Sequence, residues 1–153
     1  MFNYEDAFSR NIGWLTEQEQ TFIRSRKVAI AGMGGVGSEH LVTLCRLGIS
    51  HFNISDFDDY EVHNFNRQAG AYMSTVGRPK CEVMEQTAID INPESTVRSF
   101  PEGINESNVD DFLDGVDIYV DSLDFFALAA RKLVFKRCEE LGIPVVTAAP
   151  LGM

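Results

Sequence analysis

The chain has 153 residues, of which 44% are hydrophobic, and this size and composition suit one globular domain and exclude a disordered chain. Thirteen lysines and arginines against 23 aspartates and glutamates give a formal net charge of −10. This charge excludes a broad, sequence-independent grip on nucleic acid or on an anionic membrane surface. We therefore expect an anionic ligand to be held by a few placed groups, with neither nucleic acid nor a membrane as a partner.

The three cysteines are Cys45, Cys81 and Cys138, and they form no Cys-x-x-Cys pair. An odd number of cysteines at such spacings favours neither a disulfide framework nor a zinc site. The N-terminal residues are acidic where a signal peptide is basic and then apolar, and no apolar run approaches the length that spans a membrane. We expect a cytoplasmic protein without a zinc site.

Apolar runs and helical patterns alternate along the chain. Thr16 and Glu19 form a capping-box pattern at the start of a helix over about 16–25. The spacing of apolar residues predicts strands at 27–31, 51–55, 96–100, 117–120 and 144–148, and helices at about 36–48, 79–91, 106–113 and 125–141. Strands that alternate with helices predict an α/β fold, a Rossmann-like, doubly wound and mainly parallel sheet with helices on both faces. We expect residues 1–26 to form a short helical arm and residues 27–153 the sheet domain.

A glycine-rich segment connects the first predicted strand to the next helix, and its glycines are Gly32, Gly34, Gly35 and Gly37. Such a segment lets a phosphate approach the helix N-terminus, where unpaired N–H groups favour negative charge. Asp56 ends the second predicted strand, 19 residues beyond Gly37, where a carboxylate can accept hydrogen bonds from a ribose. Without a ligand, the glycines would only make a tight turn. The pattern favours a nucleotide but suits NAD, FAD, S-adenosylmethionine and ATP equally.

A long polar segment follows Asp56, where a hydride-transfer enzyme would have a short crossover. Within it Arg67 offers a fork of donors, and Lys80 a mobile ammonium, to a ligand with several phosphates. Asp121 and Asp124 flank the end of the fourth predicted strand, where a carboxylate could hold Mg²⁺ against phosphate oxygens. Each residue alone would be a solvated surface charge, or a helix cap in the case of Asp124. Their placement around one crevice favours a shared site.

Several motifs in a fixed order resemble the ThiF/MoeB/HesA adenylating proteins, bacterial relatives of ubiquitin-activating enzymes. The resemblance runs from about residue 10 to residue 150 and rests on the glycine-rich segment, Asp56-Phe57-Asp58, Asn64-Phe65-Asn66-Arg67-Gln68, Gly77-Arg78-Pro79-Lys80, Ile91-Asn92-Pro93 and Asp121-Ser122-Leu123-Asp124. It implies adenylation of a carboxylate with ATP, in which the carboxylate oxygen attacks the α-phosphorus and pyrophosphate leaves.

The resemblance also implies roles for individual residues. Arg10, Arg67, Lys80 and Asp124 would act catalytically, with Asp124 as the Mg²⁺ ligand. ATP would be bound by Gly32, Gly34, Gly35, Gly37, Asp56, Asp58, Asn64, Arg67, Gln68 and Lys80. The acceptor would be the C-terminus of a ubiquitin-like sulfur carrier or of a peptide. Arg10 matches an arginine that reaches the ATP of a partner subunit in such enzymes, so the resemblance implies a homodimer.

Some residues depart from the family pattern. Phe125 stands where the family has asparagine, Arg131 lies further along the chain than the common spacing, and His63 stands where serine is common. We interpret His63 as a surface histidine, because phosphoryl transfer to a carboxylate needs no base. Cys45 and Cys138 fall on apolar helix stripes and are expected in the core. Cys81 follows Lys80 at a helix start and is also explained by packing, so we expect no thioester step.

Two other functions remain open on the sequence: an NAD-dependent oxidoreductase, and a non-catalytic nucleotide-binding interaction module. Set against the family, 153 residues correspond to the ATP-binding part alone. We therefore expect the domain to be truncated at its C-terminal end, with an exposed sheet edge after residue 153, and the isolated fragment could lack activity.

Overall fold

The computed structural model describes residues 1–148 of the chain. The helices are α1 (Tyr4–Phe8), α2 (Glu17–Arg24), α3 (Gly35–Leu47), α4 (Lys80–Ile91), α5 (Val109–Leu113) and α6 (Leu128–Leu141), with short 3-10 helices η1 (Ser9–Asn11) and η2 (Val62–Asn64). The strands are β1 (Lys27–Ala31), β2 (His51–Ser55), β3 (Thr96–Phe100), β4 (Ile118–Asp121) and β5 (Val145–Thr147). All five predicted strands are present, and the predicted α/β fold is confirmed.

The five strands form one parallel sheet in the order β3-β2-β1-β4-β5. The chain starts in the middle of the sheet, winds outward to β3 and then returns to the other side, which is the doubly wound arrangement. Ala31, at the end of β1, lies opposite Ser55 on one side and Asp121 on the other. The carboxyl ends of the three central strands therefore meet at one edge of the sheet, between the two halves of the fold.

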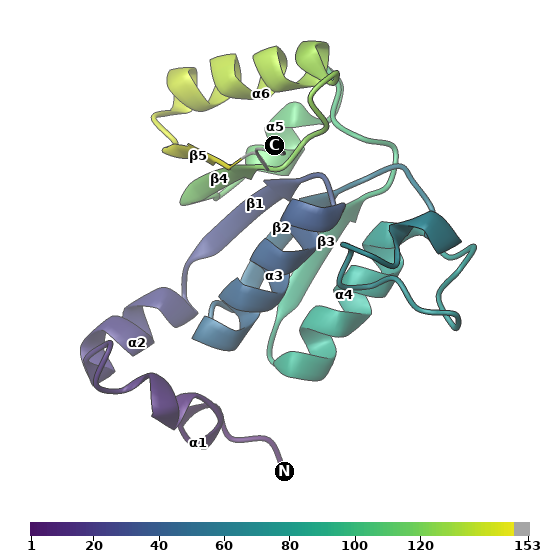
Figure 1. Ribbon diagram of the computed structural model, residues 1–153. Coiled ribbons are helices and arrows are strands. Elements are labelled where there is room, and N and C mark those ends of the chain that lie inside the picture. Colours follow the sequence, from purple (N-terminus) through teal and green to yellow (C-terminus); the bar gives the residue numbers. More distant parts are fainter. Residues whose placement is uncertain (149–153) are drawn as a thin grey trace.

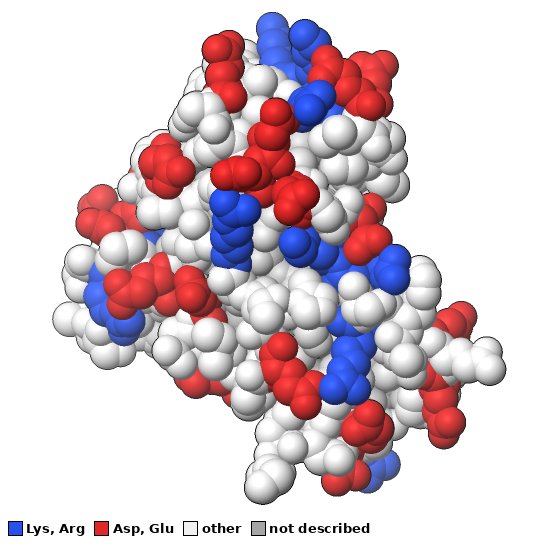
Figure 2. Space-filling model, turned by 180° about the vertical axis from the view of Figure 1, so that it is seen from behind, with Lys and Arg blue, Asp and Glu red and all other residues white. Residues whose placement is uncertain are grey.

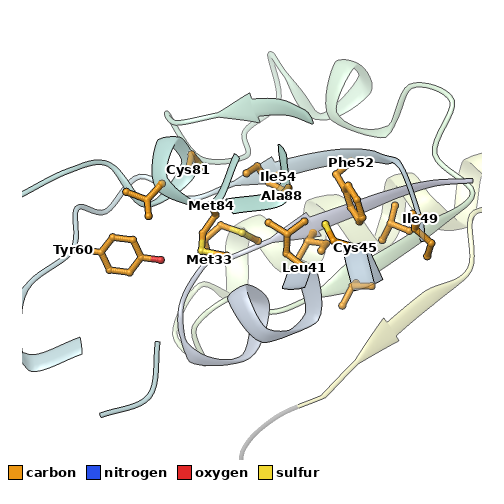
Figure 3. Packing of buried hydrophobic residues seen from close by; sticks show 14 of the residues in the cluster. Met33, Leu41, Cys45, Ile49, Phe52, Ile54, Tyr60, Cys81, Met84 and Ala88 are labelled. Atoms are coloured by element: carbon orange, nitrogen blue, oxygen red, sulfur yellow. The ribbon is translucent and has the colours of Figure 1, made fainter. Parts of the chain in front are cut away.

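Helices cover both faces of the sheet (Figure 1). On one face, α3 and α4 pack on a core that includes Phe52, Ile54 and Met84, which are fully or almost fully buried. Figure 3 shows these side chains pointing toward one another, with Cys45 and Cys81 among them. On the other face, α5 and α6 bury an aromatic cluster around Phe112 and Tyr119, and Cys138 lies in that core.

The N-terminal helices dock against the C-terminal end of α3. Tyr4 donates its hydroxyl to the carbonyl oxygen of Gly48 over 2.6 Å, and Gln20 donates to that of Leu47 over 2.8 Å. These bonds satisfy carbonyl groups that the end of a helix leaves without partners. Helix α2 begins at the predicted capping box, with Thr16 and Glu19 bonded reciprocally. The arm lies at the amino end of the strands, far from the end of β1 (Figure 1).

Two predicted helices begin later than the sequence pattern indicates. Helix α5 begins at Val109 instead of 106, because Asn105 and Asn108 hydrogen-bond to the backbone of residues 103–107 and hold it in turns. Helix α6 begins at Leu128 instead of 125, because the carboxylate of Asp124 caps a turn by accepting from the amide of Phe126. The three residues thus released from α6 form a loop at the carboxyl edge of the sheet.

Strand β5 is one edge of the sheet, and its three residues are exposed. The exposed sheet edge predicted at the C-terminal end of the chain lies outside the described residues. Within residues 1–148, no helix is both long and apolar enough to cross a membrane. Figure 2 shows that, on the face seen there, basic side chains lie close to acidic ones instead of forming one wide basic area.

Candidate functional site

A cavity of about 690 Å³ opens at the carboxyl edge of the sheet, beside the glycine-rich loop. Its lining comes from the loop after β1 with the start of α3, the long segment after β2, the first residue of α4, the end of β4 with the loop that follows, Arg131 of α6, and the residues at the end of β5. The predicted site residues among its lining are Gly32, Gly34, Gly35, Asp56, Asp58, Asn64, Arg67, Gln68, Lys80 and Asp124. The structure therefore brings together nearly all of the residues that the sequence singled out.

The glycine loop has a shape that larger side chains would not allow. Gly32 has φ +92°, and a Cβ atom there would lie 2.2 Å from the carbonyl oxygen of Ser122. A Cβ atom at Gly37 would lie 1.7 Å from the carbonyl oxygen of Gly32, so the start of α3 packs directly on the loop. Gly37 therefore shapes the loop from behind and does not line the cavity. Gly34 faces open space, with Gln68 Nε2 the nearest atom to a Cβ at 3.9 Å.

Asp56 ties the glycine loop to the end of β2. Its carboxylate accepts a hydrogen bond from the amide of Met33 over 2.6 Å and another from the amide of Asp58 over 2.8 Å. Burial raises the pKa of Asp56, while the two amides and Lys80 lower it. Each carboxylate oxygen keeps a second lone pair. Asp56 can therefore hold the loop in place and still accept a hydrogen bond from a hydroxyl group of a ligand.

The long polar segment after β2 folds back on itself and delivers Lys80 to the cavity. The amide of Tyr60 donates to the carbonyl oxygen of Arg78, and the amide of Gly77 donates to the carbonyl oxygen of Tyr60. The amide of Lys80 donates to the carbonyl oxygen of Asp58. The ammonium of Lys80 lies 3.0 Å from Asp58 Oδ2, and its side chain is only 6% exposed. A buried lysine with one carboxylate partner at a cavity wall is placed to meet a second anion.

Asn64 ends η2, and Arg67 and Gln68 follow in and just after the next turn, so all three reach the cavity wall. Asn64 is buried, and its side chain accepts from the amide of Glu61 over 2.9 Å, which fixes η2. Arg67 is exposed and bonds to the carbonyl oxygen of His63 and the side chain of Asn66, and no carboxylate of residues 1–148 pairs with it. Gln68 Oε1 is buried and has no hydrogen-bond partner among the described residues.

Asp124 lies at the cavity rim with one oxygen uncommitted. Its Oδ1 accepts from the amide of Phe126 over 3.0 Å, and the described residues place no hydrogen bond on Oδ2. Within residues 1–148, no group of three or more potential metal ligands exists. Mg²⁺ commonly binds to one or two carboxylates and completes its shell with water and substrate phosphates. A single free carboxylate oxygen at the rim fits that mode and does not fit a metal cage built from protein side chains.

The charges of the cavity lining also bear on its ligand. Six acidic residues line it, namely Asp56, Asp58, Asp59, Glu61, Asp121 and Asp124, against the three basic residues Arg67, Lys80 and Arg131. Two of the three cations are already paired, Lys80 with Asp58 and Arg131 with Asp121. A polyphosphate would therefore meet an unfavourable field unless it brought a divalent cation. The acidic lining and the free Asp124 oxygen favour the same kind of ligand, a nucleotide with its metal ion.

Two expectations on single residues have separate outcomes. Arg10 lies on η1 and does not line the cavity, so no contact within one chain brings it to the site. His63 is 65% exposed on its side chain and lies 3.4 Å from Glu61 at the cavity rim.

The three cysteines are buried, as expected. Burial raises the pKa of Cys45 and Cys81 to about 12 and that of Cys138 to about 11. These thiols are protonated at neutral pH and are poor nucleophiles.

Sequence reasoning did not predict a role for Arg131 and noted only its unusual spacing. Its guanidinium reaches back from α6 to Asp121 and to three carbonyl groups of the loop after β4. Asp121 is 1% exposed and also accepts from Tyr119 and Thr147. The separation of seven positions between Asp124 and Arg131 was a usable signal, because it leaves room for a loop before the helix.

The sequence model of the ThiF family matches residues 8–153, which is nearly the whole chain. The chain belongs to the ThiF family. It is 36% identical over 152 residues to a tRNA threonylcarbamoyladenosine dehydratase of Haemophilus influenzae, covering 98% of this chain and 57% of that protein. It is 36% identical over 132 residues to the adenylyltransferase and sulfurtransferase UBA4 of Lodderomyces elongisporus, covering 86% of this chain and 29% of that protein.

A solved structure agrees with this placement. The Escherichia coli tRNA N6-threonylcarbamoyladenosine dehydratase TcdA, in complex with ATP, superposes with a TM-score of 0.90 at 29% identity, covering 97% of this chain and 60% of that chain. The sequence resemblance to the family and the Rossmann-like fold are thereby confirmed. The chain spans a little over half the length of the dehydratases that it matches.

Proposed function

We propose that the protein binds ATP in the cavity beside the glycine loop and transfers AMP to a carboxylate. The observation that carries the proposal is the joint placement of the glycine loop, Lys80, Arg67 and Asp124 around one cavity in a ThiF-family fold. In this reaction a carboxylate oxygen forms a bond to the α-phosphorus. The bond from the α-phosphorus to its bridging oxygen breaks, and pyrophosphate leaves with the electron pair.

Each group has a role that follows from its position. Amides of the glycine loop and the N-terminus of α3 would face the phosphates, and Asp56 would accept a ribose hydroxyl. Lys80 and Arg67 would offset the charge that grows on the leaving pyrophosphate. Asn64, Asp58 and Gln68 would complete the binding site, with the unpaired oxygen of Gln68 as an acceptor. Gly37 would support the loop without touching the nucleotide.

Asp124 would hold Mg²⁺ at the cavity rim, together with phosphate oxygens. The ion would neutralise part of the phosphate charge, which the six acidic lining residues would otherwise repel. The remaining work falls to groups of the chain: the cavity orients ATP, and the buried Lys80 keeps one cation against the phosphates. The buried, protonated cysteines favour a mechanism without a thioester intermediate.

The acceptor is a carboxylate, and two sources are proposed. The first is the C-terminal tail of a ubiquitin-like sulfur carrier or a peptide. The second is a carboxylate linked to tRNA, because similar proteins are named for a threonylcarbamoyl group on a tRNA nucleoside, and a threonine joined to a carbamoyl group through its nitrogen keeps its carboxylate. The net charge of −10 excludes only nonspecific binding of nucleic acid. We therefore replace the expectation of no nucleic-acid partner by a choice between a peptide carboxylate and a tRNA-linked carboxylate.

Two further parts of the proposal concern the whole protein. A homodimer would let Arg10, which lies away from the cavity of its own chain, reach the cavity of a partner subunit. Unpaired buried thiols are typical of a reducing compartment, which supports a cytoplasmic protein.

The experiment is exchange of labelled pyrophosphate into ATP, run with the tail peptide of a sulfur carrier and with a tRNA that carries the threonylcarbamoyl group. We expect exchange that depends on Mg²⁺ and on one of the carboxylates. Lys80→Ala and Arg67→Ala should reduce it strongly, whereas Arg98→Ala, an exposed arginine on β3 outside the cavity, should not. Binding of ATP without exchange would support the non-catalytic module, and binding of NAD instead of ATP the oxidoreductase.

A further inference from the structure

One arginine, Arg131, makes most of the side-chain hydrogen bonds to the loop after β4. Arg131 lies in the first turn of α6, and helical side chains point back toward the helix N-terminus. Its Nε lies 2.7 Å from Asp121 Oδ2, and its Nη2 lies 2.7 Å from the carbonyl oxygen of Leu123. Longer contacts of 3.3 and 3.4 Å reach the carbonyl oxygens of Asp124 and Phe125. One guanidinium thus bridges the end of β4 and three successive loop residues.

Few other sources of order exist for this loop. Phe125 and Phe126 are 75% and 85% exposed, so their side chains do not anchor it in the core. At the start of the loop, the amide of Ser122 donates to the carbonyl oxygen of Ala31, and Leu123 packs on the core beneath α6. Within the described residues, the part from Asp124 to the start of α6 has only three short-range bonds of its own, two at Asp124 and one at Phe126. Asp121, by contrast, is 1% exposed and fixed by Tyr119 and Thr147 as well as by Arg131. Arg131 therefore transfers the order of the sheet to the loop that carries Asp124.

Only arginine can make this bridge. Its guanidinium is planar and presents five donors in a rigid fork, so it can meet a carboxylate on one side and carbonyl groups on the other. A lysine at the same position would keep a positive charge beside Asp121, but its donors radiate from one atom and cannot span both groups. The substitution Arg131→Lys therefore separates the ion pair from the hold on the loop.

We propose that Arg131 is a positioning residue that fixes the carboxylate of Asp124 for the metal ion of a bound nucleotide. It acts through the loop and touches neither nucleotide nor acceptor in this role. The inference rests on the proposed function for the nature of the ligand, but the hold on the loop itself does not. Residues that orient a metal ligand typically contribute a factor of about 10 to 100 in metal affinity.

The test compares Arg131→Lys with Arg137→Lys, a matched change on the same helix. Arg137 pairs with Asp110 and Glu140 and does not line the cavity. Binding of Mn²⁺ to the protein with ATP is measured by electron paramagnetic resonance, and ATP binding in the presence of a chelator by calorimetry. We expect Arg131→Lys to weaken Mn²⁺ binding by about 10- to 100-fold with little change in ATP binding without metal, and Arg137→Lys to change neither. Asp124→Asn gives the full loss for comparison.

A second readout does not depend on any ligand. Chymotrypsin cleaves after exposed phenylalanines, and cleavage after Phe125 or Phe126, identified by mass spectrometry, reports how firmly the loop is held. We expect faster cleavage there in Arg131→Lys and wild-type cleavage in Arg137→Lys. If faster cleavage is seen but the wild type binds no Mn²⁺ with ATP, the proposed function fails while the hold on the loop stands. Unchanged cleavage and Mn²⁺ binding, or loss of the fold by circular dichroism in Arg131→Lys, would overturn the inference.

Discussion

The contact between the glycine loop and the start of α3 gives a sharp prediction for Gly37→Ala. The added Cβ atom would lie 1.7 Å from the carbonyl oxygen of Gly32, and backbone atoms cannot rotate away as a side chain can. The two segments would have to separate by roughly 1.3 Å to reach the shortest distance seen for real Cβ contacts, which places the change at the costly end of overpacking. We expect a loss of at least about 3 kcal/mol in the free energy of unfolding.

Gly34→Ala is the matched control on the same loop. Its Cβ atom would lie 3.9 Å from the nearest neighbouring atom, which is an ordinary contact. Because Gly34 is the N-cap of α3, where alanine is less favourable, we expect a loss of about 1 kcal/mol or less. The same Cβ atom would stand where phosphates are proposed to approach. Gly34→Ala should therefore lose ATP affinity while keeping the fold.

Urea denaturation followed by circular dichroism measures both variants against the wild type. A loss of 3 kcal/mol corresponds to a fall of about 6–12 °C in the melting temperature for a chain of this size, so a thermal scan provides a second measure. If Gly37→Ala were no less stable than Gly34→Ala, the close packing of loop and helix would be refuted.

Three further predictions concern two residues of the site and the buried thiols. Replacing the buried Lys80 by methionine should change the unfolding free energy by no more than about 1 kcal/mol, because Asp58 stays partly in water. The same change should weaken ATP binding at least about tenfold. Equal ATP affinity of the variant and the wild type, measured by calorimetry, would contradict the placement of Lys80. Because burial raises the pKa of Asp56, the folded chain takes up a proton there at higher pH than the unfolded chain. The contribution of Asp56 to the free energy of unfolding should therefore grow as the pH falls through its folded pKa toward 3.8. In urea titrations, the wild type should gain stability relative to Asp56→Asn between pH 7 and pH 4. A loss of relative stability over this range would refute the assigned shift. With pKa values of about 11 and 12, the three thiols should react with a disulfide reagent at pH 8 only after unfolding in urea, and rapid reaction of one thiol in the native protein would reopen a thioester mechanism.

Much of the fold follows from local sequence patterns. Residues 27–31 are a short apolar run ended by a glycine, residues 51–55 alternate apolar with polar residues, and they form β1 and β2 with the predicted bounds. Helix α2 begins at its capping box, and Asn92 and Pro93 end α4. In these places one local signal is strong and nothing in the tertiary structure competes with it.

The sequence pattern was wrong where side chains compete with the backbone. The periodic apolar residues of α6 extend toward Phe125, but the turn capped by Asp124 and the reach of Arg131 hold residues 124–127 out of the helix. The asparagines before α5 act in the same way. Such bonds depend on side-chain orientation, which periodicity does not report.

The candidate site was predictable as a set of residues but not as a geometry. Motifs in chain order identified the carboxyl edge of the sheet, because parallel strands deliver their ends to one side. Gly37 lies only five positions after Gly32, and Arg131 only seven after Asp124, so their contacts depend on how the backbone turns between them and on side-chain orientation. Neither apolar periodicity nor the order of the motifs reports these contacts.

Transfer of an isotope from the acceptor carboxylate tests the central claim most directly. The candidate acceptors are labelled with ¹⁸O in their carboxylates and incubated with the protein, ATP, Mg²⁺ and hydroxylamine, which captures an acyl adenylate and releases AMP. Attack of the carboxylate on the α-phosphorus predicts AMP that carries one ¹⁸O atom, detected by mass spectrometry. Label in inorganic phosphate instead, or AMP without label, would contradict adenylation of a carboxylate.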